Sequence, residues 1–172
     1  VEELVWSRRM SVDDEALSCI NRTVSNATDI FFDGCNVHVR NGGGGTTSSN
    51  GKGNLVIGYN SPFDYFGNNV SNSRTGSHNL VVGDGHSYVS YGGVVTGQDN
   101  KIMESYAVAV GGQRNEATGK SSVVVGGSDN KATGFKASVF GGGENRAIGG
   151  ISSVTGGALN VASGSTSSVF GC

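Results

Sequence analysis

Residues 121–157 read SSVVVGGSDNKATGFKASVFGGGENRAIGGISSVTGG and repeat five features at an interval of fifteen residues. The repeating features are Asn, Ala, Gly, Val and the pair Gly-Gly. A fixed short period indicates that each repeat stacks on the preceding one. Fifteen residues suit two short strands and two tight turns, so one repeat is predicted to be one coil of a β-solenoid. Adjacent coils would then pair as parallel strands.

The fifteen-residue spacing is regular over residues 92–172, the predicted run of β-roll repeats. Because side chains alternate along a strand, we expect the columns that contain Ala117 and Val124 to point inward. A core of Ala, Val and Ser is thin, so the coil must be flattened. One column holds Asn100, Asn115, Asn130, Asn145 and Asn160. We interpret it as a structural ladder, in which each amide bonds its copy or the neighbouring backbone, rather than as a binding site.

The residues before the regular repeats are less periodic. Residues 1–27 are predicted as a short helical or stalk-end segment. Residues 28–52 are predicted as a β-hairpin, with its turn at Asp33-Gly34, followed by a Gly-rich loop. Residues 53–91 are predicted as irregular solenoid coils with an insertion, because the motif GNLVIG returns as HNLVVG.

Composition and charge exclude several classes of partner. The 172 residues include 30 glycines, and the formal net charge is −2. This balance does not favour a nucleic-acid partner or an acidic membrane surface. No apolar run approaches the ~18 residues of a membrane span, so we expect no membrane insertion of this chain.

Catalytic and metal-binding patterns are missing from the sequence. His38, His78 and His86 lack the spacing of a zinc site, and the motifs of a nucleophile elbow, a phosphate loop or a calcium repeat do not occur. Acidic residues are scattered, whereas a sugar-active solenoid enzyme usually places paired carboxylates on one face. We therefore predict no catalytic residue, no metal, no cofactor and no enzymatic activity.

The repeat Asn-x-Ala-x-Gly-x-x-Ser-x-Val-x-Gly-Gly resembles the head repeats of YadA-like trimeric autotransporter adhesins. The resemblance covers roughly residues 90–171 and, more loosely, 53–90. It implies an all-β fold, a left-handed parallel β-roll, with three chains packed around one axis. It also implies an extracellular or cell-surface location and a non-enzymatic adhesive role, with host or cell-surface proteins or glycans as partners.

An outward column beside the Gly-Gly pairs indicates self-association independently of the resemblance. Apolar residues that point out of a soluble roll favour a buried contact between chains, although scattered exposed apolar residues are common. The column holds Val110, Val125, Phe140, Thr155 and Phe170. We predict that its four apolar members contribute to a homotrimer interface.

Binding character is concentrated in the non-repetitive part of the chain. An aromatic patch there would suit sugars or protein surfaces, which leaves a carbohydrate-binding solenoid module as an alternative function. The candidate residues are Tyr59, Phe63, Tyr65, Phe66, Arg74, Tyr88 and Tyr91. The other interpretation is that these aromatics cap the open end of the solenoid.

Cysteines and glycosylation sequons offer covalent links. Cys19 and Cys35 could form an intrachain disulfide, which leaves Cys172 free or paired with another chain. An intermolecular bond at Cys172 would suit a second alternative, the self-assembling subunit of an extracellular fibre. Candidate N-glycosylation sites are Asn21, Asn26 and Asn69.

Overall fold

The computed structural model describes residues 20–21, 30–32, 34–62 and 72–171. Within these ranges the regular elements are strands and no helix occurs. The chain divides into two units, Val1–His38 and Val39–Cys172. The helical segment predicted over 1–27 falls almost entirely outside the described residues.

The first unit contains one antiparallel pair of short strands. β1 (Ile20–Asn21) pairs with β2 (Phe31–Phe32), with Ile20 opposite Phe32. The hairpin predicted within 28–52 includes residues outside the described ranges and stays a prediction; among the described residues β2 pairs with β1, and residues 36–40 form no strand. Gly34 does adopt φ 71°. A turn residue fixes the local reversal of the chain, but it does not decide which segment pairs.

Cys35 is disulfide-bonded. The other two cysteines of the chain, Cys19 and Cys172, lie outside the described residues. The pairing of Cys35 with Cys19 therefore stays a prediction.

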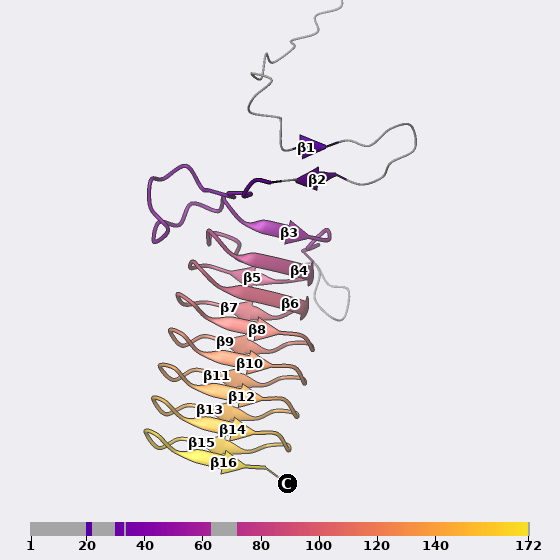
Figure 1. Cartoon of the computed structure of the whole chain (residues 1–172). Coiled ribbons are helices and arrows are strands. Elements are labelled where there is room, and N and C mark those ends of the chain that lie inside the picture. The colour runs from indigo at the N-terminus through magenta and orange to yellow at the C-terminus, as the bar shows by residue number, and fades with distance from the viewer. Residues whose placement is uncertain (1–19, 22–29, 33, 63–71, 172) are drawn as a thin grey trace, which may run out of the picture. The chain divides into compact units, whose positions relative to one another are not determined.

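The second unit is a parallel β-solenoid built from two sheets (Figure 1). From β4 onward, consecutive strands alternate between the sheets, so each coil contributes one strand to each. The eight-stranded sheet contains β3 (Leu55–Ile57), β4 (Leu80–Asp84), β6 (Val94–Gln98), β8 (Val108–Val110), β10 (Val123–Val125), β12 (Ser138–Phe140), β14 (Ser153–Thr155) and β16 (Ser168–Phe170). The six-stranded sheet contains β5 (Ser87–Tyr88), β7 (Lys101–Ile102), β9 (Glu116–Ala117), β11 (Lys131–Ala132), β13 (Arg146–Ala147) and β15 (Val161–Ala162).

Strand register follows the sequence period. Val124 pairs in parallel with Val139, and Ala132 pairs with Ala147. Each pairing joins residues fifteen positions apart, the same step that separates Asn115 from Asn130. The prediction of an all-β solenoid with 15-residue coils is thereby confirmed.

The core lies between the inner faces of the two sheets and is as thin as the composition predicts. The eight-stranded sheet contributes Val81, Val95, Ala109, Val124, Val139 and Val154, and the six-stranded sheet contributes Tyr88, Ile102, Ala117, Ala132, Ala147 and Ala162. A larger side chain on one sheet is matched by a smaller one on the other. Ile102 occupies the position of Ala117 in the next coil, and Ala109 occupies the position of Val124. The interior volume is thus kept while single residues change, the kind of exchange that cores tolerate best.

The asparagine column forms a continuous hydrogen-bonded ladder inside the solenoid. Asn115 Oδ1 accepts the backbone N–H of Asn130 at 3.0 Å, and Asn115 Nδ2 donates to the carbonyls of Gly111 and Gly127 at 3.3 and 3.1 Å. The same contacts recur at Asn130, where Oδ1 accepts the N–H of Asn145. Each side chain therefore bonds backbone groups in its own coil and in the next, and so helps to satisfy polar groups that an apolar interior cannot.

Glycine is required where neighbouring coils approach most closely. A Cβ on Gly127 would collide with the carbonyl oxygen of Gly142 and would also meet the side-chain amide of Asn130. Gly127 has φ 76° as well, a conformation that costs a non-glycine residue energy. The Gly-Gly pair thus leaves room for the asparagine ladder in each coil.

We predict that Asn130→Ala strongly destabilises the solenoid. The substitution removes the side-chain partner of the N–H of Asn145 and of the carbonyl of Gly126, whereas Gly142 O keeps the N–H of Ser128 at 3.0 Å. Each buried group left unpaired costs roughly 1–3 kcal/mol. Urea unfolding followed by circular dichroism measures the loss. Asn160→Ala is the control, since Asn160 is half-buried; a loss at Asn130 no larger than at Asn160 would contradict the ladder's role.

We predict that Ser122→Ala leaves stability unchanged or raises it. Ser122 is fully buried, and its hydroxyl has no hydrogen-bond partner among the described residues. Alanine occupies the same position in the adjacent coils, at Ala107 and Ala137. Removing the unpaired hydroxyl should increase the free energy of unfolding by about 1 kcal/mol. Thermal unfolding tests this against Ser167→Ala, whose exposed hydroxyl donates to Gly164 O at 2.7 Å; a clear loss at Ser122 would refute the argument.

Candidate functional site

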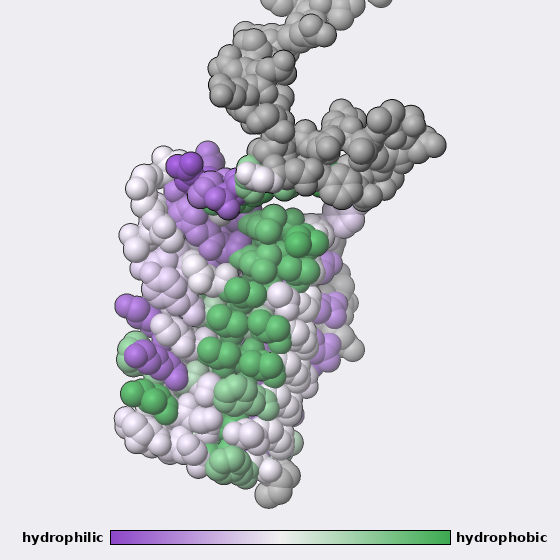
Figure 2. All heavy atoms as spheres, in the orientation of Figure 1, coloured by the Kyte–Doolittle hydropathy of each residue, from purple (hydrophilic) through white to green (hydrophobic). Residues whose placement is uncertain are grey.

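The outward face of the eight-stranded sheet is the main candidate for an interaction surface. Two outward columns cross all eight strands, and neither contains a charged residue. One column holds Leu55, Leu80, Val94, Val108, Val123, Ser138, Ser153 and Ser168, and the other holds Ile57, Val82, Thr96, Val110, Val125, Phe140, Thr155 and Phe170. We call these two columns the apolar face. Figure 2 shows the hydrophobic side chains as a green column over these strands.

The four residues predicted for a trimer interface all belong to the apolar face. Their side chains are exposed, from 40% at Val110 to 81% at Phe170. Val125 and Phe140 lie between them, 42% and 50% exposed. Sequence reasoning found this column and missed the other, which lies two residues earlier on the same side of each strand. The period of two along a strand was the signal that would have found it.

The outward face of the six-stranded sheet has the opposite character. Lys101 Nζ lies 3.4 Å from Glu116 Oε1, and Lys131 Nζ lies 3.1 Å from Glu116 Oε2. Arg114 donates two hydrogen bonds to the Asp129 carboxylate, at 2.8 and 2.7 Å, and holds the pKa of Asp129 below its ordinary value. Exposed ion pairs add little stability. Their consequence is a hydrated, charged surface.

A charged cleft of about 480 Å³ lies on this same side of the solenoid. It is lined by Asp129, Lys131, Glu144 and Arg146. Acids and bases alternate there. The Asp129 carboxylate is already engaged by Arg114, and Lys131 is engaged by Glu116. The cleft therefore presents mixed charge rather than a single sign that would select a cation or an anion.

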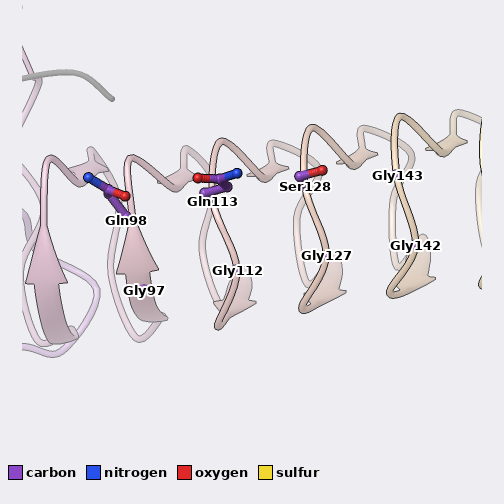
Figure 3. Close-up of a pocket in the computed structure, with 8 residues that line it drawn as sticks. All are labelled: Gly97, Gln98, Gly112, Gln113, Gly127, Ser128, Gly142 and Gly143. Atoms are coloured by element: carbon purple, nitrogen blue, oxygen red, sulfur yellow. The ribbon is translucent and has the colours of Figure 1, made fainter. Parts of the chain in front are cut away.

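A groove of about 620 Å³ runs across several coils (Figure 3). Its lining consists of Gly97, Gln98, Gly112, Gln113, Gly127, Ser128, Gly142 and Gly143. The polar side chains of Gln98, Gln113 and Ser128 stand in successive coils along it. The glycine carbonyls beneath are engaged by the asparagine ladder, as Gly112 O is by Asn100 Nδ2 at 3.2 Å. The lining contains no ionisable side chain.

The predicted aromatic patch is not assembled by the described residues. Tyr88 is a core residue, only 5% exposed, so its assignment to a surface patch was wrong. Tyr59 is 98% exposed and follows β3, whereas Tyr91 precedes β6. Since the strands are parallel, these two tyrosines lie at opposite ends of the strands, Tyr59 at the carboxyl ends and Tyr91 at the amino ends. Phe63, Tyr65 and Phe66 lie outside the described residues.

Arg74 and Tyr91 make contacts within the solenoid. Arg74 Nη2 donates to the carbonyl of Ser61 at 3.0 Å, so it ties together the two ends of the insertion. Tyr91 packs edge-to-face against Tyr106, with ring centroids 5.5 Å apart. Tyr106 remains 47% exposed. Tyr91 and Tyr106 occupy equivalent positions in successive coils, which brings their rings into this edge-to-face contact.

The predicted modification sites are not tested by the structure. Asn26 and Asn69 lie outside the described residues, and so does Cys172. Asn21 lies in β1. The described ranges contain no group of three or more His, Cys, Asp or Glu able to hold a metal ion. No helix in them is long and apolar enough to cross a membrane.

The geometry therefore offers one uncharged apolar face, one charged face and a polar groove on a rigid repeat. Comparisons with protein-family models, with curated proteins and with solved structures found no match.

Proposed function

We propose that this chain is a non-enzymatic, adhesin-like or structural module whose solenoid assembles into a homotrimer outside the cell. The observation that carries the proposal is the apolar face, which crosses all eight strands without a charged residue. A contiguous apolar surface of this kind is characteristic of a surface that is covered by another molecule. The charged face of the six-stranded sheet is the surface that remains in water.

A second copy of the same chain is the occupant that fits best. The apolar face repeats with the coil, so two copies placed side by side would present the same columns to one another along their length. Ser138, Ser153 and Thr155 interrupt the apolar residues with small polar ones, which allow close approach. Burial of Val125 and Phe140 would remove from water side chains that are 42% and 50% exposed in a single chain.

The proposed number of chains and the adhesive role rest on the resemblance of the repeat to YadA-like adhesin heads. A location outside the cell is supported by the disulfide at Cys35, since disulfides persist in oxidising compartments. In this arrangement the solenoid is a rigid support, and the surfaces that face outward from the trimer meet the partner. Host or cell-surface proteins and glycans are the proposed partners.

We predict that Val125→Lys converts the trimer to monomers. A lysine in the middle of the apolar face would place three uncompensated charges in the interface. Size-exclusion chromatography with light scattering measures the molecular mass. Val161→Lys is the matched control, because Val161 is 49% exposed on the outward side of β15 in the charged sheet. The control should keep the mass of three chains.

A wild-type chain that is monomeric at every concentration tested would overturn the homotrimer. Equal dissociation by Val125→Lys and Val161→Lys would overturn the assignment of the interface. Long filaments in place of a discrete trimer would favour the fibre instead. Adhesion is tested separately, by binding of the trimer to immobilised matrix proteins and to a glycan array, with the Val125→Lys monomer for comparison.

A further inference from the structure

His86 occupies a position of the asparagine ladder. It is fully buried. Its Nδ1 accepts the backbone N–H of Asn100 at 3.2 Å, as Asn100 Oδ1 accepts the N–H of Asn115 at 2.8 Å in the next step. The N–H of His86 in turn donates to Asn60 Oδ1 at 2.8 Å. The ladder therefore runs from Asn60 through His86 into the regular repeats.

The other imidazole nitrogen, Nε2, makes the contact that the side-chain amide nitrogen makes in a ladder asparagine. His86 Nε2 lies 3.1 Å from the carbonyl of Val82, four residues earlier. Asn100 Nδ2 donates to the carbonyl of Thr96, also four residues earlier, at 2.7 Å. A glycine stands three residues before His86 and before each later ladder asparagine, and a Cβ on Gly83 would meet His86 Nε2. The surroundings of His86 are thus those of a ladder asparagine.

These contacts require one tautomer of a neutral imidazole. Nδ1 must present a lone pair to the N–H of Asn100, and Nε2 must carry the proton that it donates to Val82 O. A protonated ring carries hydrogen on both nitrogens. Two N–H groups would then face each other between His86 and Asn100, and a buried backbone donor would lose its acceptor. Asparagine cannot undergo this change, because its amide does not titrate.

Charged and titratable groups around His86 come from strand β4 and from two connecting segments. Asp84 lies at the end of β4, Arg74 donates through Nε to the carbonyl of His86 at 3.4 Å, and Asp99 directly precedes Asn100. Burial lowers the pKa of His86, against the smaller opposing effects of hydrogen bonds with the backbone of Val82, Asn100 and Gly97 and of the Asp84 charge. Desolvation of the imidazolium is therefore the dominant effect.

We infer that His86 is a pH-sensitive joint in the asparagine ladder: its protonation opens the contact between the coil of His86 and the coil of Asn100. The joint lies where the irregular coils meet the regular repeats. The opening is local to this contact, because the pairing of β4 with β6 and the backbone hydrogen bond from Asp99 N–H to Asp84 O still join the two coils. This inference stands independently of the proposed trimer.

The direction of the pH effect follows from linkage. His86 binds a proton more weakly in the closed ladder than in an opened one, where its pKa would return to the ordinary histidine value of about 6.5. The closed state is therefore fully favoured above pH 6.5 and loses stability as the pH falls below it. The opened fraction rises by up to about tenfold for each pH unit below that value, until the ring in the closed state is itself protonated.

Hydrogen exchange measured by mass spectrometry tests the joint on the full chain. We compare pH 7.5 with pH 5.5, after correction for the intrinsic pH dependence of exchange, in peptides that contain the amide of Asn100 and in peptides that contain the amide of Asn145. At the lower pH, protection should fall by up to about tenfold at Asn100 and stay unchanged at Asn145, whose N–H is held by Asn130 Oδ1.

His86→Asn is the matched variant, because it restores the residue type of every later step and removes the titrating group. It should fold and show the same protection at Asn100 at both pH values. His78→Gln controls for the second histidine of these coils, whose Nε2 accepts the N–H of Asn41 at 3.3 Å. It should keep the wild-type loss at Asn100. Undiminished wild-type protection at pH 5.5, the same loss in His86→Asn, or its disappearance in His78→Gln would each overturn the inference.

Discussion

The structure depends on a hydrogen bond between a buried side-chain amide and the backbone of the next coil. A core of Val, Ala and Ser is too thin to exclude polar backbone from the interior, so the turn groups need partners within it. Asn115 and Asn130 each satisfy three such groups. Because the ladder step is the same from Asn100 onward, the coils there share one length and one register.

The ladder leaves the two outer faces free to differ. The interior repeats closely from Ala117 onward, whereas outward positions such as those of Val125 and Lys131 change from coil to coil. One sheet carries an apolar face and the other carries the Lys101–Glu116–Lys131 ion pairs. A rigid repeat with two unlike faces is well suited to self-association through one face and exposure of the other, which is the basis of the proposed function.

Sequence reasoning was most accurate where the period was strict. The inward positions of Ala117 and Val124 and the parallel pairing of Val124 with Val139 followed from the fifteen-residue interval alone. It was least accurate before residue 92. Tyr88 was assigned to a surface patch because it is aromatic and lies near an insertion, yet it fills the core where later coils have Ala. The pairing of β2 with β1 was not predicted.

The sequence by itself determined the coil length, the alternation of inward and outward residues, and the columns that repeat. These properties follow from a local period, which is readable without coordinates. Only the tertiary structure decided that His86 continues the asparagine column. The physical reason is that equivalence in a solenoid is defined by hydrogen bonds between coils. An insertion separates Asn60 from His86, so their spacing in the sequence no longer matches the repeat. Their equivalence is seen only in the hydrogen bond between them.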